Sequence, residues 1–190
     1  MNIGKENLEE VNISPDDLEE SDVIAMYKVQ ETAIIQKKII EVFLKDHDTL
    51  EELKYNKDLV MAAIEKEIYK LKETSKKFKN DKTVVMATVM QDGFTLEFAS
   101  DTLQNDKDVV LAAVKRYGKS LKWASHQLKN DKDVVLTAVT QNGLALEYAS
   151  KRLQNNKDIV LAAVQNDRHA LKYASERLQN DPDILALLDN

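Results

Sequence analysis

Hydrophobic and polar positions recur along this chain with a period of 25 residues. The segment that starts at 105 reads NDKDVVLAAV, and close copies start at 130 and 155. In each copy a short polar stretch precedes a run that is apolar nearly all round, which predicts a helix buried on most sides. The repeats form five full units and a truncated sixth, at 55–79, 80–104, 105–129, 130–154, 155–179 and 180–190.

Start and stop signals bound this first helix of each unit. An Asn or Asp precedes each apolar run and predicts an N-cap, and Pro182 directly after Asp181 fits the first helical position. A glycine follows the run in the second, third and fourth units, at Gly93, Gly118 and Gly143, and predicts a helix end with a positive φ. We therefore expect a first helix of about ten residues. The N-cap column comprises Asn56, Asp81, Asp106, Asp131, Asn156 and Asp181.

The second half of each unit also has helical spacing. Leu121, Ala124, Ser125 and Leu128 recur at intervals of three and four residues, which predicts a second helix with one buried face. We interpret the repeated serine as a small residue at a helix crossing, bonded to the carbonyl one turn back. The aromatic residues beside this face are expected to pack in the core between units, at Phe98, Trp123, Tyr148 and Tyr173.

These patterns predict an all-α fold, a solenoid-like stack of 25-residue two-helix repeats with an N-terminal helical cap. A two-helix unit cannot bury its own apolar faces, so each interface between units requires the same residues again. Residues 55–190 would hold five repeats and a C-terminal capping helix. Residues 23–54 are amphipathic and predict a helical cap or a decayed repeat, with a dimerisation helix at 23–45 as the alternative to a monomer.

The net charge of −6 is unevenly distributed. Residues 1–22 carry eight acidic residues and one Lys, a formal charge of −7, so the rest of the chain sums to +1. The body therefore lacks the basic footprint of a nucleic-acid-binding protein. The acidic segment is interpreted as a partly disordered tail, with an interaction tail as the alternative.

Catalytic and metal-binding patterns are absent from the sequence. There is no Cys, and His47, His126 and His169 fall at different positions of the repeat without a helical partner. No Gly-rich phosphate loop or nucleophile elbow occurs. The sequence thus predicts no catalytic residues, no metal, no cofactor and no enzyme activity. No apolar stretch of about 18 residues occurs, so no membrane span is expected.

The turn after the first helix varies from unit to unit, although the core positions do not. Side chains suited to binding occur there, at Phe94, Arg116, Tyr117, Leu144, Arg168 and His169. For Phe94 and Leu144 a hydrophobic staple is an equal alternative. The charge at another position of the repeat alternates in sign from unit to unit, at Lys72, Glu97, Lys122, Glu147 and Lys172. We expect these side chains to form a structural ladder of ion pairs.

The segment NDKDVVLAAVKRYGKSLKWASHQLKNDKDVVLTAV resembles the DUF4116 repeat family, with its D-x-x-V-V-L-A-A-V run, a Gly and an A-L-x-Y-A-S-x-x-L pattern. The resemblance covers about 55–190 and implies an α-helical repeat scaffold, found in protists and in bacteria that include host-associated ones. It carries over no catalytic residue. Arg168 replaces the glycine of the pattern, and Glu73 replaces its aromatic residue.

We therefore expect a non-enzymatic helical-repeat scaffold that binds a protein partner of unknown identity, as a bacterial effector or adaptor would. The alternative is an inhibitor or accessory subunit of a nucleic-acid enzyme, in which the acidic tail mimics phosphate. The N-terminal residues MNIGKENLEEV lack an apolar run, so no Sec-type signal peptide is expected. A cytoplasmic location follows from this expectation, with non-Sec export to a host as the alternative.

Overall fold

The computed structural model describes residues 34, 56–65 and 71–188. The chain divides into two compact units, 1–45 and 46–190. Ile34 is helical and exposed, and it is the one described residue of the first unit. The expectations for the acidic tail at 1–22 and for a cap or decayed repeat at 23–54 otherwise lie outside the described residues. The repeats belong to the second unit.

The first half of each repeat is an α-helix, as the apolar runs predict. Helix α7 begins after Asp106, whose carboxylate accepts hydrogen bonds from the amides of Asp108 and Val109 and so acts as the predicted N-cap. In the truncated sixth unit, Pro182 occupies the first turn. These helices are α3 (Lys57–Glu65), α5 (Lys82–Gln91), α7 (Lys107–Arg116), α8 (Lys132–Gln141), α10 (Lys157–Asn166) and α12 (Pro182–Leu185).

The second half of each repeat is not the single helix that its spacing predicts. A 3-10 helix comes first, and the chain is extended at the following Ala–Ser step, for example at Ala99 (ψ 156°) and Ser100 (ψ 157°). A short helix then completes the repeat. The 3-10 segments are η2 (Leu71–Glu73), η3 (Gly93–Phe98), η4 (Gly118–Trp123), η6 (Gly143–Tyr148) and η7 (Arg168–Tyr173). The short helices are α4 (Lys76–Lys79), α6 (Asp101–Gln104), η5 (Leu128–Asn130), α9 (Lys151–Gln154) and α11 (Glu176–Gln179).

The repeated serine causes this break, and its predicted role was wrong. The Oγ atom of Ser100 accepts a hydrogen bond from the amide of Leu103 and caps α6. The same hydroxyl donates to Oδ1 of Asn80 in the preceding repeat, at 2.6 Å. The Ser100 amide donates to the carbonyl of Lys79, at 2.8 Å. Serine therefore joins neighbouring repeats, and the same bonds recur at Ser125, Ser150 and Ser175.

The repeated glycine also has a different role from the predicted one. Helix α5 ends at Gln91, and Asp92 turns the chain with an extended backbone (φ −139°, ψ 106°). The glycine itself does not adopt a positive φ. A Cβ at Gly93 would lie 2.3 Å from the carbonyl oxygen of Ala113 in the next repeat. Glycine is therefore required because two backbones approach closely there.

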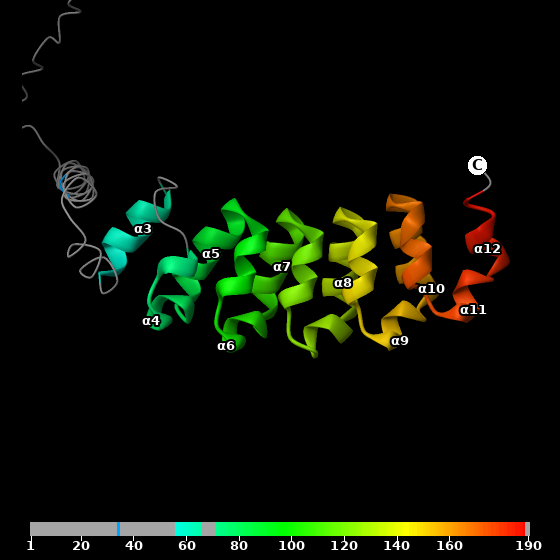
Figure 1. Ribbon diagram of the computed structural model, residues 1–190, viewed down its shortest axis with the longest axis horizontal. Helices are drawn as coiled ribbons and strands as arrows, with labels where there is room; N and C mark the ends of the chain where they lie inside the picture. Colours follow the sequence, from blue (N-terminus) through cyan, green and yellow to red (C-terminus); the bar gives the residue numbers. More distant parts are fainter. Residues whose placement is uncertain (1–33, 35–55, 66–70, 189–190) are drawn as a thin grey trace, which may run out of the picture. The chain divides into compact units, whose positions relative to one another are not determined.

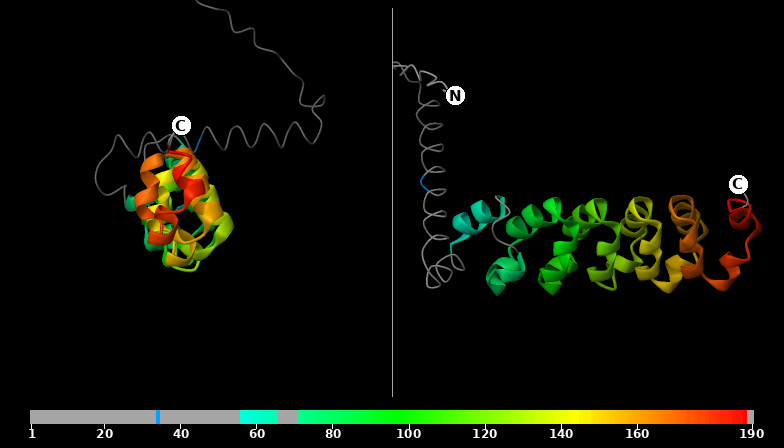
Figure 2. Two further views of the ribbon diagram at one scale, coloured as in Figure 1. Left: turned by 90° about the vertical axis from the view of Figure 1, so that its right-hand side faces the viewer. Right: turned by 45° about the horizontal axis from the view of Figure 1, so that its top comes forward.

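The repeats lie one after another in a single row, with the long helices side by side and the short helices along the opposite edge (Figure 1). Seen along the row, they lie nearly behind one another (Figure 2). Each long helix packs against the next, and the 3-10 segments do the same. This packing forms one continuous core, to which the third repeat contributes Val109, Val110, Ala113, Val114, Leu121 and Leu128.

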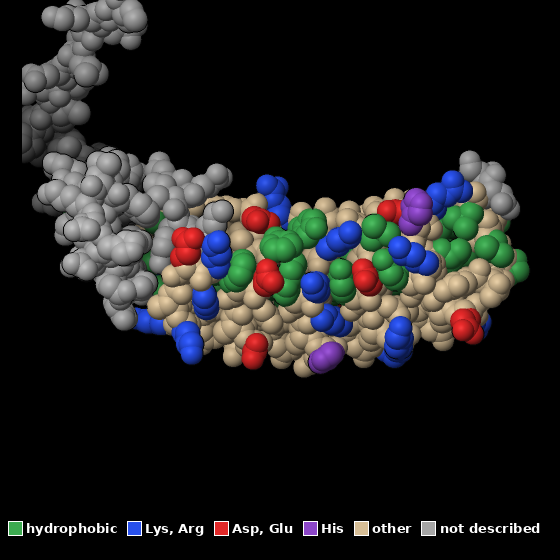
Figure 3. Space-filling model, viewed as in Figure 1, with side chains coloured by type: hydrophobic (Ala, Val, Ile, Leu, Met, Phe, Trp, Pro, Cys, Tyr) green, Lys and Arg blue, Asp and Glu red, His purple; other side chains and the backbone are tan. Residues whose placement is uncertain are grey.

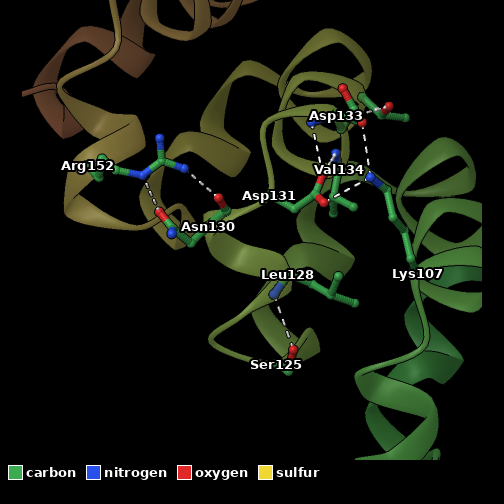
Figure 4. Close-up of polar contacts among 9 residues, drawn as sticks. Lys107, Ser125, Leu128, Asn130, Asp131, Asp133, Val134 and Arg152 are labelled. Atoms are coloured by element: carbon green, nitrogen blue, oxygen red, sulfur yellow. Dashed lines mark hydrogen bonds and ion pairs between the residues drawn. The ribbon is translucent and has the colours of Figure 1, made fainter.

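Ion pairs also fasten each repeat to the next. Lys107 Nζ lies 2.8 Å from the carboxylate of Asp131, the N-cap of α8 in the following repeat (Figure 4). It also lies 3.0 Å from the carboxylate of Asp133 in the first turn of that helix.

Lys–Asp pairs link each repeat to the next from α3 to α12, although Lys57 pairs only with Asp81 and Lys132 only with Asp158. The aspartates were predicted as caps, but their pairing with the lysine one repeat earlier was not predicted. The signal was present, because a Lys follows nearly every N-cap residue.

Candidate functional site

Three aromatic rings from two neighbouring repeats meet at the surface. Phe94 belongs to η3, Tyr117 is the residue after α7, and Trp123 ends η4. The Phe94 ring lies edge-on to Trp123, with 4.3 Å between ring centroids, and 6.0 Å from the Tyr117 ring. Phe94 nevertheless remains 41% exposed. The contact with Trp123 gives Phe94 an internal partner, but much of its ring still faces solvent.

The aromatic residues at one position of successive repeats, which we call the aromatic column, continue this cluster along the row. They are Phe98, Trp123, Tyr148 and Tyr173. Their side chains pack against the core but are only partly buried, whereas the leucine two residues earlier is fully buried at Leu96, Leu121 and Leu146. Trp123 is mostly buried against the core, as its predicted position between units requires, but its ring retains some exposed surface. We call the surface formed by these rings the aromatic face, and it comprises Phe94, Phe98, Tyr117, Trp123, Tyr148 and Tyr173.

Charged side chains lie directly beside the rings. The Lys122 ammonium group is 5.7 Å from the Trp123 ring centroid, and that of Lys172 is 4.8 Å from the Tyr173 centroid. At these distances a cation is attracted to the face of the ring. The Tyr148 phenol instead has Glu147 beside it. Burial raises the pKa of Tyr148, and the charge and hydrogen bonding of Glu147 raise it further, so the phenol stays protonated at neutral pH.

The charges beside the rings form the column of alternating sign, which we call the charge column. All five side chains are exposed: Lys72, Glu97, Lys122, Glu147 and Lys172. Among the described residues, the ion pairs join other side chains, so the predicted ladder of ion pairs within this column was wrong. Acidic and basic side chains line one face of the repeats, with hydrophobic side chains between them (Figure 3). The charge column and the aromatic face therefore form one surface.

Arg116 has an internal role that sequence reasoning missed. Its Nε donates to the carbonyl of Gln91, the last residue of the preceding long helix, at 3.0 Å. The equivalent residues Gln141 and Asn166 also reach back one repeat, where each accepts a hydrogen bond from a glycine amide. The last residue of each of these helices thus connects to the repeat before it. Tyr117, the next residue, lies on the aromatic face.

The other predicted contact residues are dispersed. Leu144 is half-buried, and its amide donates to Asn142, the residue that turns the chain after α8. Arg168 stands at the position of the repeated glycine. Its guanidinium donates to the carbonyl of Leu188 in the truncated unit. His169 is exposed, and both its amide and its Nδ1 lie 2.9 Å from Oδ1 of Asp167. Of the six predicted contact residues, the structure brings only Phe94 and Tyr117 together in ring contact.

A shallow groove of about 500 Å³ lies between α5 and α7, and the sequence analysis did not find it. Met90 is 64% exposed at its edge. The sequence signal was weak, because in the other full repeats the equivalents of Met86 are Met or Leu and the equivalents of Met90 are Glu, Lys, Thr and Gln. The groove is lined by Met86, Met90, Asp108, Leu111, Ala112, Lys115 and Arg116.

Within residues 34, 56–65 and 71–188, no three His, Asp or Glu side chains are grouped as metal ligands would be. No described helix is long and apolar enough to cross a membrane. The Lys–Asp pairs between repeats are grouped polar side chains, and they hold the repeats together. The surface with the clearest capacity for recognition is therefore the aromatic face.

Comparison with known proteins agrees with this architecture. The model of a family described as a domain of unknown function, DUF4116, matches residues 56–104, 81–129, 106–154 and 156–185. Each of the first three matches spans two repeats and overlaps the next of the three by about one repeat, whereas the fourth begins after the third has ended. No curated protein and no solved structure matches the chain. With more than half of its length matched in register with the repeats seen in the structure, the chain belongs to the DUF4116 family.

Proposed function

We propose that this chain is a non-enzymatic helical-repeat scaffold that binds another protein through the aromatic face. The observation that carries the proposal is the surface cluster of Phe94, Tyr117 and Trp123. Tyr and Trp are the residues that most often dominate the binding energy of protein interfaces. If these positions only stabilised the fold, a buried aliphatic side chain would serve as well, because it would expose no apolar surface to water.

The way the repeats are joined favours a preorganised surface. The rings lie on 3-10 segments or, for Tyr117, directly before one, and each repeat is tied to the previous one by the Ser–Asn hydrogen bond and by the Lys–Asp ion pairs. A surface that is already ordered loses less conformational entropy when a partner binds. The proposed scaffold therefore needs no folding step on binding.

The charge of the surface favours protein over nucleic acid as the partner. The charge column has three Lys and two Glu, so it offers no continuous row of positive charge for a phosphate backbone. Mixed charges around aromatic residues are typical of the polar rim of a protein interface. We place this scaffold in the cytoplasm of a bacterium, where the reducing environment agrees with a chain without Cys. Its proposed role there is that of an effector or adaptor.

Affinity capture from a lysate of the encoding organism tests the proposal, with wild-type chain and a Phe94→Ser, Tyr117→Ser variant compared by mass spectrometry. We expect a protein that the wild type captures to be lost with the variant, by at least about tenfold in recovery. The matched control is Met90→Ser, which removes an exposed apolar side chain from the groove between α5 and α7.

Circular dichroism establishes that all three chains are equally helical. A captured protein that survives the double change but is lost with Met90→Ser would place binding at the groove and contradict the proposal. Turnover of a substrate by the purified chain would contradict the non-enzymatic part.

A further inference from the structure

The charge column holds exposed charges that form no ion pairs with one another, and several of them lie beside aromatic rings. The lysines that fasten the repeats, such as Lys107, lie instead on the long helices. The sign of the column alternates from repeat to repeat. A ligand that lies along the aromatic face would therefore meet a charge of the opposite sign at each successive repeat.

Ring and charge together create two kinds of subsite that alternate along the row. In the third and fifth repeats a lysine ammonium group lies beside the ring, at Trp123 and Tyr173. In the second and fourth repeats a carboxylate precedes the ring, at Phe98 and Tyr148. Each subsite thus offers an apolar surface and one charge, and the favoured charge of a ligand changes sign at every step.

The spacing of the subsites selects the ligand conformation. Packed helices lie about 8–10 Å apart, so equivalent rings in adjacent repeats should be separated by about that distance. A polyproline II helix presents the same side after about three residues, or about 9 Å. A β-strand presents the same side after about two residues, or less than 7 Å, which does not match. Aromatic surfaces are also the usual docking sites for proline-rich segments.

We propose that the aromatic face binds an extended, proline-rich segment of the partner, in which charge alternates in sign at about every third residue. Acidic side chains of the segment lie opposite Lys122 and Lys172, and basic side chains lie opposite Glu97 and Glu147. Prolines between them pack on the rings. This inference rests on the proposed function, because it names the chemistry of the partner at the same surface.

The one tryptophan of the chain reports on binding, because Trp123 is part of the face. Its fluorescence is titrated with peptides of about twelve residues, long enough for about four repeats in the polyproline II conformation. The first peptide repeats Lys-Pro-Pro-Glu-Pro-Pro. The second has the same composition with both Lys triplets before both Glu triplets. The third has its charges at every second residue.

We expect the alternating peptide to bind at least about tenfold more tightly than the other two. In the second peptide about half of the charges meet a like charge, and each exposed pair changes affinity by up to about fivefold. The double variant Glu97→Lys, Glu147→Lys makes every charge of the column positive, and it should abolish the preference for the alternating peptide. The matched control, Asp101→Lys with Glu176→Lys, makes the same change in net charge on the short helices α6 and α11 and should preserve it.

Equal affinity for all three peptides, or no response to any of them, would overturn the inference. A response to oligothymidine without a response to the peptides would also overturn it, because the face would then bind nucleic acid. The wild-type titrations do not depend on the variants folding. If the peptides fail while capture of a protein still requires Phe94 and Tyr117, the proposed function stands and only the ligand chemistry is wrong.

Discussion

The carbonyl oxygen of Ala113 lies 2.3 Å from the point that a Cβ on Gly93 would occupy, so the backbones of successive repeats are in contact there. The same relationship joins Gly118 to Ala138 and Gly143 to Ala163. The obstructing atom is a backbone atom inside a helix, which cannot rotate away as a side chain can. The distance between successive repeats therefore depends in part on the absence of a side chain at these glycines.

Gly118→Ala should lower the free energy of unfolding by roughly 1–3 kcal/mol, because the added methyl group forces two helices apart. Its Cβ would lie 2.4 Å from the Ala138 carbonyl oxygen. Urea unfolding followed by circular dichroism measures the change. Arg168→Ala is the matched control, since the equivalent position there already carries a side chain. An equal loss for both variants would show that contact between repeats is not the cause.

Lys107→Gln should destabilise the chain more than Lys132→Gln. Lys107 pairs with two carboxylates, Asp131 and Asp133, whereas Lys132 pairs only with Asp158 because residue 156 is Asn. Both lysines are about half exposed, so both losses should be small and should shrink with added salt. Thermal unfolding at low and high salt measures them. A difference that persists unchanged at high salt would argue against an electrostatic origin.

Stability should fall as the pH drops below about 3.8, the ordinary pKa of the capping aspartates. Burial raises the pKa of Asp106, but hydrogen bonds from Lys82 and the Val109 amide, with the charge of Lys82, outweigh burial and hold the pKa below its usual value. Because the folded pKa is the lower one, the ionised caps stabilise the fold above pH 3.8, and that stabilisation is lost on protonation.

Asp106→Asn with Asp131→Asn tests the origin of this pH dependence. Asn156 caps α10 in the natural sequence, so the double variant should still fold. We expect lower stability than the wild type at neutral pH and a smaller loss between pH 5 and pH 2, about the range over which a depressed carboxyl pKa acts. Unfolding curves at each pH give both quantities. An unchanged pH dependence would assign the acid sensitivity to other carboxylates.

Two buried or half-buried serines in one repeat should respond oppositely to alanine. Ser125 accepts a hydrogen bond from the Leu128 amide and donates to Asn105, so Ser125→Ala should cost about 1 kcal/mol or more. Ser120 is fully buried, and its Oγ has no hydrogen-bond partner among the described residues. Ser120→Ala should therefore be neutral or stabilising by up to about 1 kcal/mol. Urea unfolding of both variants tests the contrast, and a large loss for Ser120→Ala would reveal a partner for its hydroxyl.

The sequence by itself determined the 25-residue period, the bounds of the long helices and their N-caps. These depend on local features, because an Asp followed by an apolar run favours a helix start wherever it occurs. The Asp106 cap and the first-turn Pro182 are where the pattern predicts them. The same pattern identified Phe94 and Tyr117 as surface candidates, because these positions vary while the core positions do not.

Only the tertiary structure decided what the second half of each repeat does. Leu121, Ala124 and Leu128 are buried at helical spacing, yet the chain breaks between them, because Ser125 forms its hydrogen bonds with the previous repeat instead of within a helix. Periodicity records which side chains are buried, but it cannot distinguish a continuous helix from a 3-10 segment followed by a turn of helix. The bonds that decide between them join residues about twenty positions apart.

The same limit explains the glycine, the lysine and the candidate site. A glycine after a helix suits a positive φ or a close backbone approach equally well, and only the neighbouring Ala113 carbonyl distinguishes them. Lys107 meets Asp131 and Asp133 because one repeat brings residues 24 and 26 positions apart into contact. Phe94 and Trp123 became one surface for the same reason. Local chemistry fixed the units, and packing between the units decided the contacts.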